Sequence, residues 1–281
     1  MSSLIAAYLF LGGTGAGLFL CAAISQLAPG IGAVLGNTST RAYAVSLGML
    51  AVGSGCLLLD LGRPAAIAAL FFPDRMSWIS LGAWGLLALM TCETLLLILG
   101  ETRRVMLGKV LLNAGAICAV YLAFYTGLLL RFSSGVDLWN TAALPVLFFC
   151  SSMAAGAAAF ILCARTYDQS PYARRQALRF IPGAEAALIA AEIAATISYL
   201  VSVSAQPFGA QATAVLFSGA NAVLFWAGFV SLGLAVPLGA DILGLRKIGG
   251  DWAPIIGSFA ALAGAFCLRY VLVRAGINVL Y

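Results

Sequence analysis

Residues 142–164, AALPVLFFCSSMAAGAAAFILCA, contain no charged side chain. As an α-helix this stretch would be roughly 35 Å long, enough to cross the ~30 Å hydrocarbon layer of a bilayer. It is too long for a strand of a membrane barrel, which needs about 10 residues. Comparable apolar stretches recur along the chain, so we predict eight membrane-spanning helices. They are expected at residues 4–27, 42–62, 77–100, 109–131, 142–164, 181–203, 214–240 and 255–275.

The overall composition also predicts an all-α, multi-pass membrane protein. Of the 281 residues, 63% are hydrophobic and 9% are charged, and the mean hydropathy is +1.04. A soluble domain carries roughly 25% charged residues, so a soluble enzyme and a disordered chain are excluded. The loops are short, and we expect any terminal substrate to be handled by a domain on another polypeptide. Membrane lipid is an expected partner, and nucleic acid is not.

The loop charges predict the orientation of the chain. About two thirds of the 15 Lys and Arg residues fall on one side of the predicted spans. By the positive-inside rule, that side is cytoplasmic and both termini are extracytoplasmic. Tryptophans near the span ends are typical of interfacial anchors. We expect this role for Trp78, Trp84, Trp139 and Trp252.

Small residues on two spans predict close helix packing. Gly13 and Gly17 have the GxxxG spacing, and residues 154–157 read Ala-Ala-Gly-Ala. Such faces let helix backbones approach each other closely in a membrane.

The residue inventory limits redox chemistry within this polypeptide. The sequence contains no histidine, so a histidine-ligated haem or metal site cannot form. The seven cysteines lie inside apolar stretches without a C-x-x-C spacing, which favours packing over cluster ligation. We therefore expect no haem and no metal in this subunit.

A charged pair stands at the predicted end of the second span. Asp60 precedes Arg63 by three residues, so both can meet on one helical face, and Pro64 stops the helix. Two interpretations stay open. The pair can close the helix terminus as a structural ion pair, or it can present a carboxylate and a guanidinium to a polar ligand head group.

Tyrosines lie at the same predicted depth as this pair. Tyr121 and Tyr125 are four residues apart and share a helical face, and Tyr8 and Tyr199 fall in the same half of the membrane. An isolated tyrosine is usually an interfacial anchor. Several phenols at one level beside Asp60 suggest a pocket for a mostly apolar ligand with polar oxygens.

Besides Asp60, three carboxyl groups lie within predicted spans, as does the guanidinium of Arg269. Ionisable groups there are costly and are candidates for functional sites. Glu93 and Glu192 can form steps of a proton path, with Glu185 nearer the cytoplasm. Alternatively, each is a neutral acid bonded to a neighbouring helix. Arg269 requires an acidic or carbonyl partner.

Several ordered segments resemble the NrfD/PsrC family of membrane subunits. The resemblance extends from the first to the last span. It is carried by residues 8–17 (YLFLGGTGAG), 59–64 (LDLGRP), 76–78 (MSW), 82–84 (GAW), 125–129 (YTGLL), 138–141 (LWNT), 144–145 (LP) and 268–276 (LRYVLVRAG).

The resemblance implies a fold and a function beyond what composition can establish. Such subunits have eight helices in two four-helix bundles, here expected at 1–135 and 136–281, and contain no haem. They exchange electrons between membrane menaquinone or ubiquinone and a ferredoxin-like, four-cluster Fe–S subunit. That subunit serves a molybdopterin catalytic subunit. The resemblance thus implies a quinone-reactive anchor in a bacterial or archaeal cytoplasmic membrane, not catalytic alone on the terminal substrate.

The resemblance places the quinone pocket in the first bundle near the extracytoplasmic face. We expect Tyr8, Tyr125, Asp60 and Arg63 to form it, with Asp60 and Arg63 as the catalytic pair. Some relatives bind quinone through an Asn and a His at the start of the first helix, where this sequence has Ile5 and Tyr8. A phenol ordinarily ionises only near pH ~10, so Asp60 is the expected proton acceptor.

Two other functions fit parts of the sequence. A proton-coupled secondary transporter of a small solute would use Glu93 and Glu192 for coupling. The lack of Pro- or Gly-broken helices at corresponding positions of the two halves counts against it. A structural anchor with a degenerate quinone site is the third interpretation.

Overall fold

The computed structural model describes residues 2–27, 36–61, 77–100, 106–132, 138–165, 171–207, 209–245 and 252–280, and these residues are helical apart from short turns. Among them, eight helices are long and apolar enough to cross a membrane, which confirms the predicted spans. The helices are α1 (Ser2–Leu27), α2 (Gly36–Leu61), α4 (Trp78–Leu99), α5 (Met106–Phe132), α6 (Ala143–Arg165), α7 (Pro171–Ser204), α8 (Gly209–Leu216), α9 (Gly219–Val223), η3 (Leu224–Ala235), α10 (Val236–Leu245) and α11 (Ala253–Leu280).

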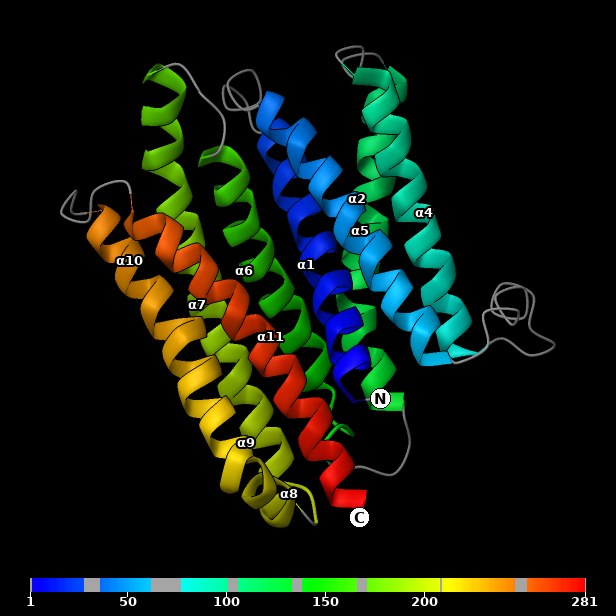
Figure 1. The fold of residues 1–281 in the computed structure, drawn as a ribbon, viewed down its shortest axis with the longest axis vertical. Coiled ribbons are helices and arrows are strands. Elements are labelled where there is room, and N and C mark those ends of the chain that lie inside the picture. The colour runs from blue at the N-terminus through cyan, green and yellow to red at the C-terminus, as the bar shows by residue number, and fades with distance from the viewer. Residues whose placement is uncertain are drawn as a thin grey trace.

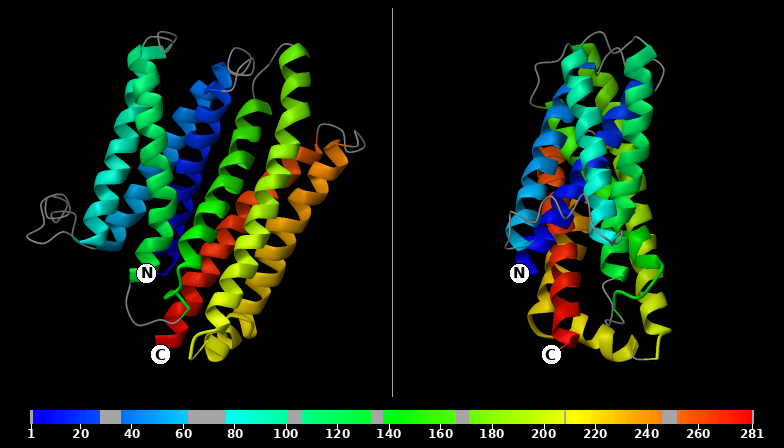
Figure 2. Two further views of the ribbon diagram at one scale, coloured as in Figure 1. Left: turned by 180° about the vertical axis from the view of Figure 1, so that it is seen from behind. Right: turned by 90° about the vertical axis from the view of Figure 1, so that its right-hand side faces the viewer.

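The spanning helices of the first half lie on one side of the molecule, and those of the second half lie on the other (Figures 1 and 2). Helix α1 lies at the seam, where it packs against α2 and α5 and against α6 and α11. Helix α1 begins and α11 ends at the same end of the molecule, here called the terminal end (Figure 1). The predicted boundary at 135/136 lies outside the described residues, and the grouping into two bundles stays a prediction.

Small residues bring α1 and α6 into backbone contact at the seam. A Cβ atom added to Gly17 would overlap the backbone of Ser152, and one added to Gly156 would overlap the backbone of Gly17. The predicted small-residue faces therefore do pack closely. This contact fixes the separation of the two halves of the molecule.

A pair of alanine substitutions tests the role of this contact. Gly17→Ala should lower stability, because overpacking costs about 1–3 kcal/mol and outweighs the gain in helix propensity of about 1 kcal/mol. Gly48→Ala is the matched control, since a Cβ there meets nothing within 4 Å. Thermal unfolding of the two variants in detergent measures the difference. Equal melting temperatures would contradict a tight seam.

The seventh span departs from the predicted uninterrupted helix over 214–240. Helix α8 ends at Leu216. The helix is then interrupted, because Ser218 has an extended backbone and Gly219 has a φ of 54°. The helix then continues as the π-helical segment η3, whose last bond joins the Val236 N–H to the Ser231 carbonyl. Pro237 lies in the first turn of α10, directly after the π-helical segment, where the missing N–H of proline is tolerated.

Trp139 is not an interfacial anchor, contrary to the sequence-based prediction. Its side chain is buried, its ring covers Gly276, and its Nε1 donates to the carbonyl of Leu272 at 2.9 Å. The phenol of Tyr199 likewise donates to the carbonyl of Leu138 at 2.8 Å. Together these bonds tie the start of the second half to α7 and α11. The local sequence indicates how deep an aromatic side chain lies in the membrane, but it does not show which group that side chain contacts.

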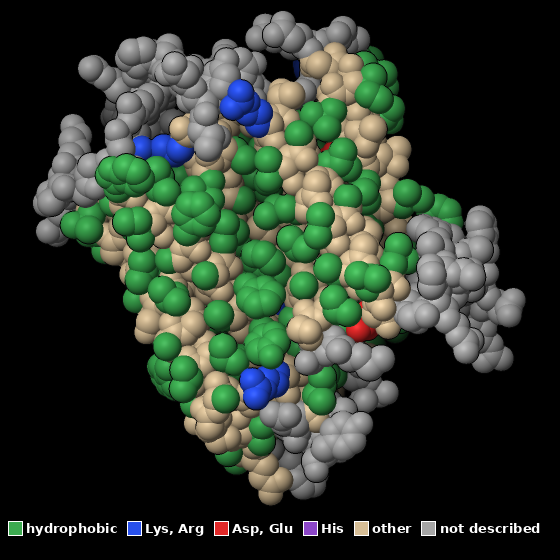
Figure 3. Space-filling model, viewed as in Figure 1, with side chains coloured by type: hydrophobic (Ala, Val, Ile, Leu, Met, Phe, Trp, Pro, Cys, Tyr) green, Lys and Arg blue, Asp and Glu red, His purple; other side chains and the backbone are tan. Residues whose placement is uncertain are grey.

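Trp78, Trp84 and Trp252 are exposed, in keeping with the interfacial role predicted for them. On the face shown in Figure 3, Lys and Arg side chains lie toward the two ends of the molecule. Hydrophobic side chains, other uncharged side chains and backbone make up most of the remaining described surface (Figure 3). This distribution suits a protein whose middle band contacts lipid.

Candidate functional site

Three phenols gather near the terminal end of the first half. Tyr121 and Tyr125 extend from one face of α5, with ring centroids 5.9 Å apart. Tyr8 of α1 lies within electrostatic range of both. The structure therefore brings together the predicted pair Tyr8 and Tyr125, with Tyr121 beside them. We call these three residues the phenol cluster.

Glycines of α4 make the space for two of these rings. A Cβ atom on Gly82 would overlap the phenol of Tyr125, and one on Gly85 would lie 2.5 Å from Cε1 of Tyr121. The Tyr125 hydroxyl donates to the carbonyl of Trp78 at 2.8 Å, in the first turn of α4. This hydrogen bond holds the Tyr125 side chain in place. It also uses the only hydroxyl hydrogen of Tyr125, so none is left to donate to a ligand.

The cluster reaches the surface through one member. Tyr121 is 37% exposed, whereas Tyr8 and Tyr125 are 2% and 1% exposed. Toward the terminal end, Trp78 stacks on Phe132 with ring centroids 3.9 Å apart. The phenol cluster thus has one exposed member, and an aromatic stack lies next to it toward the terminal end.

Asp60 lies in the last turn of α2 at the terminal end. Its Oδ1 atom is buried and has no hydrogen-bond partner. Nearby on the same helix, Gly53 packs against Leu11 and the backbone of Tyr8, so Asp60 lies about 10 Å further along the axis. No described contact joins Asp60 to the phenol cluster, and Arg63 lies outside the described residues.

Glu93 is bound between three helices. It is fully buried on α4, and its Oε1 lies 2.5 Å from Oγ of Ser46 on α2, which also lies 2.8 Å from the carbonyl of Gly15 on α1. Serine has one hydroxyl hydrogen, so both contacts are satisfied when Glu93 is protonated and donates to Ser46. This geometry fits a neutral acid bonded to neighbouring helices.

Arg269 and Glu192 meet in the second half, next to the seam. The guanidinium of Arg269 donates to Ser151 Oγ at 3.1 Å, to Ser152 Oγ at 2.9 Å and to the carbonyl of Ala265 at 2.9 Å. Glu192 of α7 is hydrogen-bonded to Ser151 and interacts electrostatically with the guanidinium. Arg269 thus has the acidic and carbonyl partners that its burial requires.

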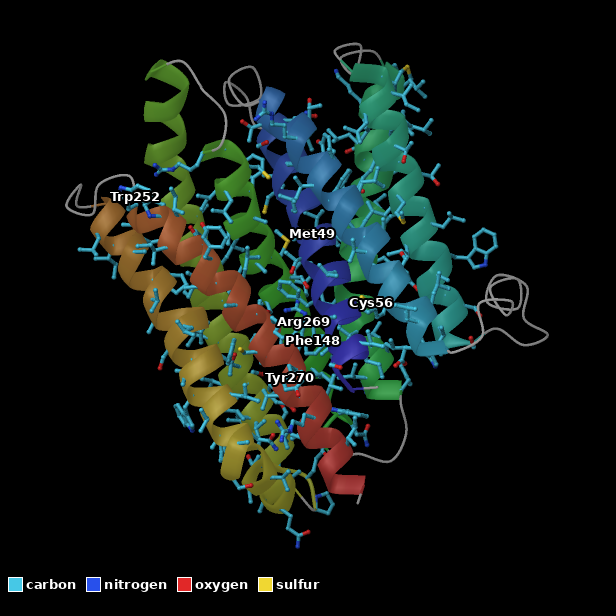
Figure 4. All side chains as sticks on the ribbon, viewed as in Figure 1. Met49, Cys56, Phe148, Trp252, Arg269 and Tyr270 are labelled. Carbon is cyan, nitrogen blue, oxygen red and sulfur yellow. The ribbon has the colours of Figure 1, made fainter. Side chains whose placement is uncertain are left out.

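Aromatic rings complete the surroundings of this guanidinium. Its Cζ lies 5.5 Å from the ring centroid of Phe148 and 6.0 Å from that of Phe10. Figure 4 shows Arg269 and Phe148 side by side where α11 crosses α6. The charge is therefore enclosed by serines, one carboxyl group and two rings. No described contact links this centre to Glu93.

A further acidic pair was not predicted from the sequence. Glu185 of α7 and Asp241 of α10 are hydrogen-bonded to each other through their carboxyl groups. The predicted seventh span ends at residue 240, which wrongly places Asp241 in a loop. Its position directly after an apolar run was the available signal. Among the described residues, no cluster of three or more His, Cys, Asp or Glu could hold a metal ion.

These features define a multi-pass α-helical membrane protein with a phenol cluster and the buried Glu93 in the first half, and with further buried carboxyl groups and a guanidinium in the second. The protein belongs to the family described as polysulphide reductase, NrfD, whose family model matches residues 2–281. It is 27% identical to the C subunit of polysulfide reductase from Wolinella succinogenes, over 97% of this sequence and 92% of that protein.

Two further relatives match part of the sequence. The NrfD homolog of Haemophilus influenzae is 28% identical and NrfD of Escherichia coli is 29% identical. Each alignment covers 57% of this protein and 50% of the relative.

Proposed function

We propose that this protein is the haem-free, quinone-reactive membrane subunit of a respiratory oxidoreductase complex. The observation that carries the proposal is the phenol cluster, whose member Tyr121 is exposed at the surface, in a member of this family. In this proposal the terminal end is extracytoplasmic and the helices form two four-helix bundles. A ferredoxin-like Fe–S subunit receives or supplies electrons, and a molybdopterin subunit acts on the terminal substrate. The membrane is the bacterial or archaeal cytoplasmic membrane.

The protein's own residues would position the quinol and remove its protons. Oxidation of a quinol to a quinone releases two electrons to the Fe–S partner and two protons. Tyr8 is the better candidate to donate a hydrogen bond to a ligand oxygen, because Tyr125 donates to Trp78. Asp60, paired with Arg63, would accept a proton at the terminal end, and the reverse reaction would use the same groups.

Removing one phenol hydroxyl tests the proposal. Tyr8→Phe should lower quinol-linked turnover of the purified complex about tenfold, as expected for one lost hydrogen bond of roughly 1.4 kcal/mol. Turnover with an artificial dye, which bypasses this subunit, should not change. Tyr199→Phe is the matched control, because this tyrosine is equally buried but bonded to Leu138 in the other half. Equal quinol-linked turnover in the two variants would argue against the site.

A proton-coupled transporter is the second candidate. The π-helical seventh span supplies one interrupted helix, as transporter sites often have. The corresponding third span, α4, is a continuous helix over Trp78–Leu99, which disfavours a repeat-related site. Purification distinguishes the two functions, since only the first requires bound Fe–S and molybdenum-containing subunits.

A further inference from the structure

The Glu185–Asp241 pair lies between α7 and α10, away from the phenol cluster. The two carboxyl groups are hydrogen-bonded to each other, and the residues are 3% and 2% exposed. Figure 1 shows α10 and α7 running together on the side of the molecule remote from α4. The proposed quinone chemistry does not use either residue.

A count of protons shows that this pair holds at least one. A carboxylate has only acceptor atoms, so two carboxyl groups form a hydrogen bond only when one carries a proton. Two ionised carboxylates at this separation would also repel strongly. In addition, Oε1 of Glu185 and Oδ2 of Asp241 are buried without any hydrogen-bond partner. These free oxygens are positions where a second proton can bind.

Among the described residues, the groups that act electrostatically on this pair include no cation. The groups in electrostatic range of Glu185 are Asp241 and the thiol of Cys21, which α1 contributes. Asp241 interacts with Glu185, and no Lys or Arg of the described part of the protein faces either group. With one proton the two carboxyl groups together carry one negative charge. With two protons they are neutral.

The pair also has a polar neighbour along α7. Glu185 and Glu192 are seven residues apart, so they share a helical face with a separation of about 10 Å along the axis. Glu192 connects through Ser151 to Arg269 at the seam. Polar groups therefore extend from the Glu185–Asp241 pair toward the centre of the molecule.

We propose that Glu185 and Asp241 form a reversible proton-binding site that alternates between one and two protons. A hydronium ion from the end opposite the terminal end gives its proton to a free carboxylate oxygen and leaves as water. Release reverses this step. The inference goes beyond the proposed quinone chemistry and holds without it, since no electron is transferred.

Infrared difference spectroscopy of the purified full-length protein tests this site. Lowering the pH should increase the carbonyl-stretch absorbance of protonated carboxylic acids by the equivalent of one group per protein. Glu185→Gln and Asp241→Asn should each shift the pH at which this increment appears, because an amide keeps the hydrogen bond but only one carboxyl group remains, and the variant with both substitutions should abolish it. Two separate amide variants guard against a folding defect in one of them.

A third variant and a salt titration complete the experiment. Glu93→Gln is the matched control, since it removes a buried acid already bonded to Ser46, and the increment should persist. An unshifted increment in both single variants, or one that survives in the double variant, would overturn the proposal. A band that responds to sodium at constant pH would overturn it in favour of a cation site. Neither readout requires quinone turnover, so failure of the proposed function leaves the result interpretable.

Discussion

Asp60→Asn should abolish quinol-linked turnover of the complex, with a loss of at least about 100-fold, while dye-linked turnover stays normal. A positioned acid or base contributes typically 10²- to 10⁴-fold to a proton-transfer step. The Oδ1 atom of Asp60 is buried without a partner, so no described interaction competes for it. An asparagine of the same shape cannot take up a proton from a quinol. The loss should therefore appear in turnover more than in quinol affinity.

The conservative variant separates proton transfer from structure. Asp60→Glu restores a carboxyl group and should recover a large part of the activity, although its added methylene displaces the oxygens. The amount of complex recovered from membranes should be the same for the unaltered protein, Asp60→Asn and Asp60→Glu. Normal quinol-linked turnover in Asp60→Asn would show that another group accepts the proton, and the site would have to be reassigned.

The span pattern was predictable because hydropathy is a local property. A run such as 142–164 spans the membrane whatever its neighbours are, and all eight predicted runs correspond to long apolar helices. The seam contact was also predictable in part. If Gly17 faced lipid, alanine would serve equally well there. A glycine at this position, four residues after Gly13, therefore indicates a face that packs against another helix.

Contacts between distant segments were not predictable in the same way. Nothing adjacent to Trp139 in the sequence shows that its partner is the carbonyl of Leu272, far along the chain. Similarly, the sequence placed Tyr125 near a ligand but could not show that its proton is donated to Trp78. Asp241 shows a different limit, because a span boundary misplaced by a few residues moved a buried acid into a loop.

Arg269→Met should be the most destabilising single substitution at the seam, with a cost of about 3–5 kcal/mol. Removing one member of a buried charge pair leaves the other charge uncompensated, and this penalty is large in a medium of low dielectric constant. Here the substitution would leave Glu192 without its cation and Ser152 without its donor. A methionine fills most of the volume, so the loss reports on charge more than on a cavity.

Two comparisons make this prediction specific. Arg131→Met, at the end of α5, removes an arginine that lies 5.8 Å from the Phe132 ring and should cost no more than about 1 kcal/mol. The double variant Arg269→Met with Glu192→Leu should recover much of the stability, because it removes both buried charges together. Thermal unfolding in detergent measures all three proteins. If the double variant is as unstable as Arg269→Met alone, the cost arises from lost packing around Phe148 and Phe10. If it is clearly more stable, Glu192 and Arg269 hold the seam as a compensated pair.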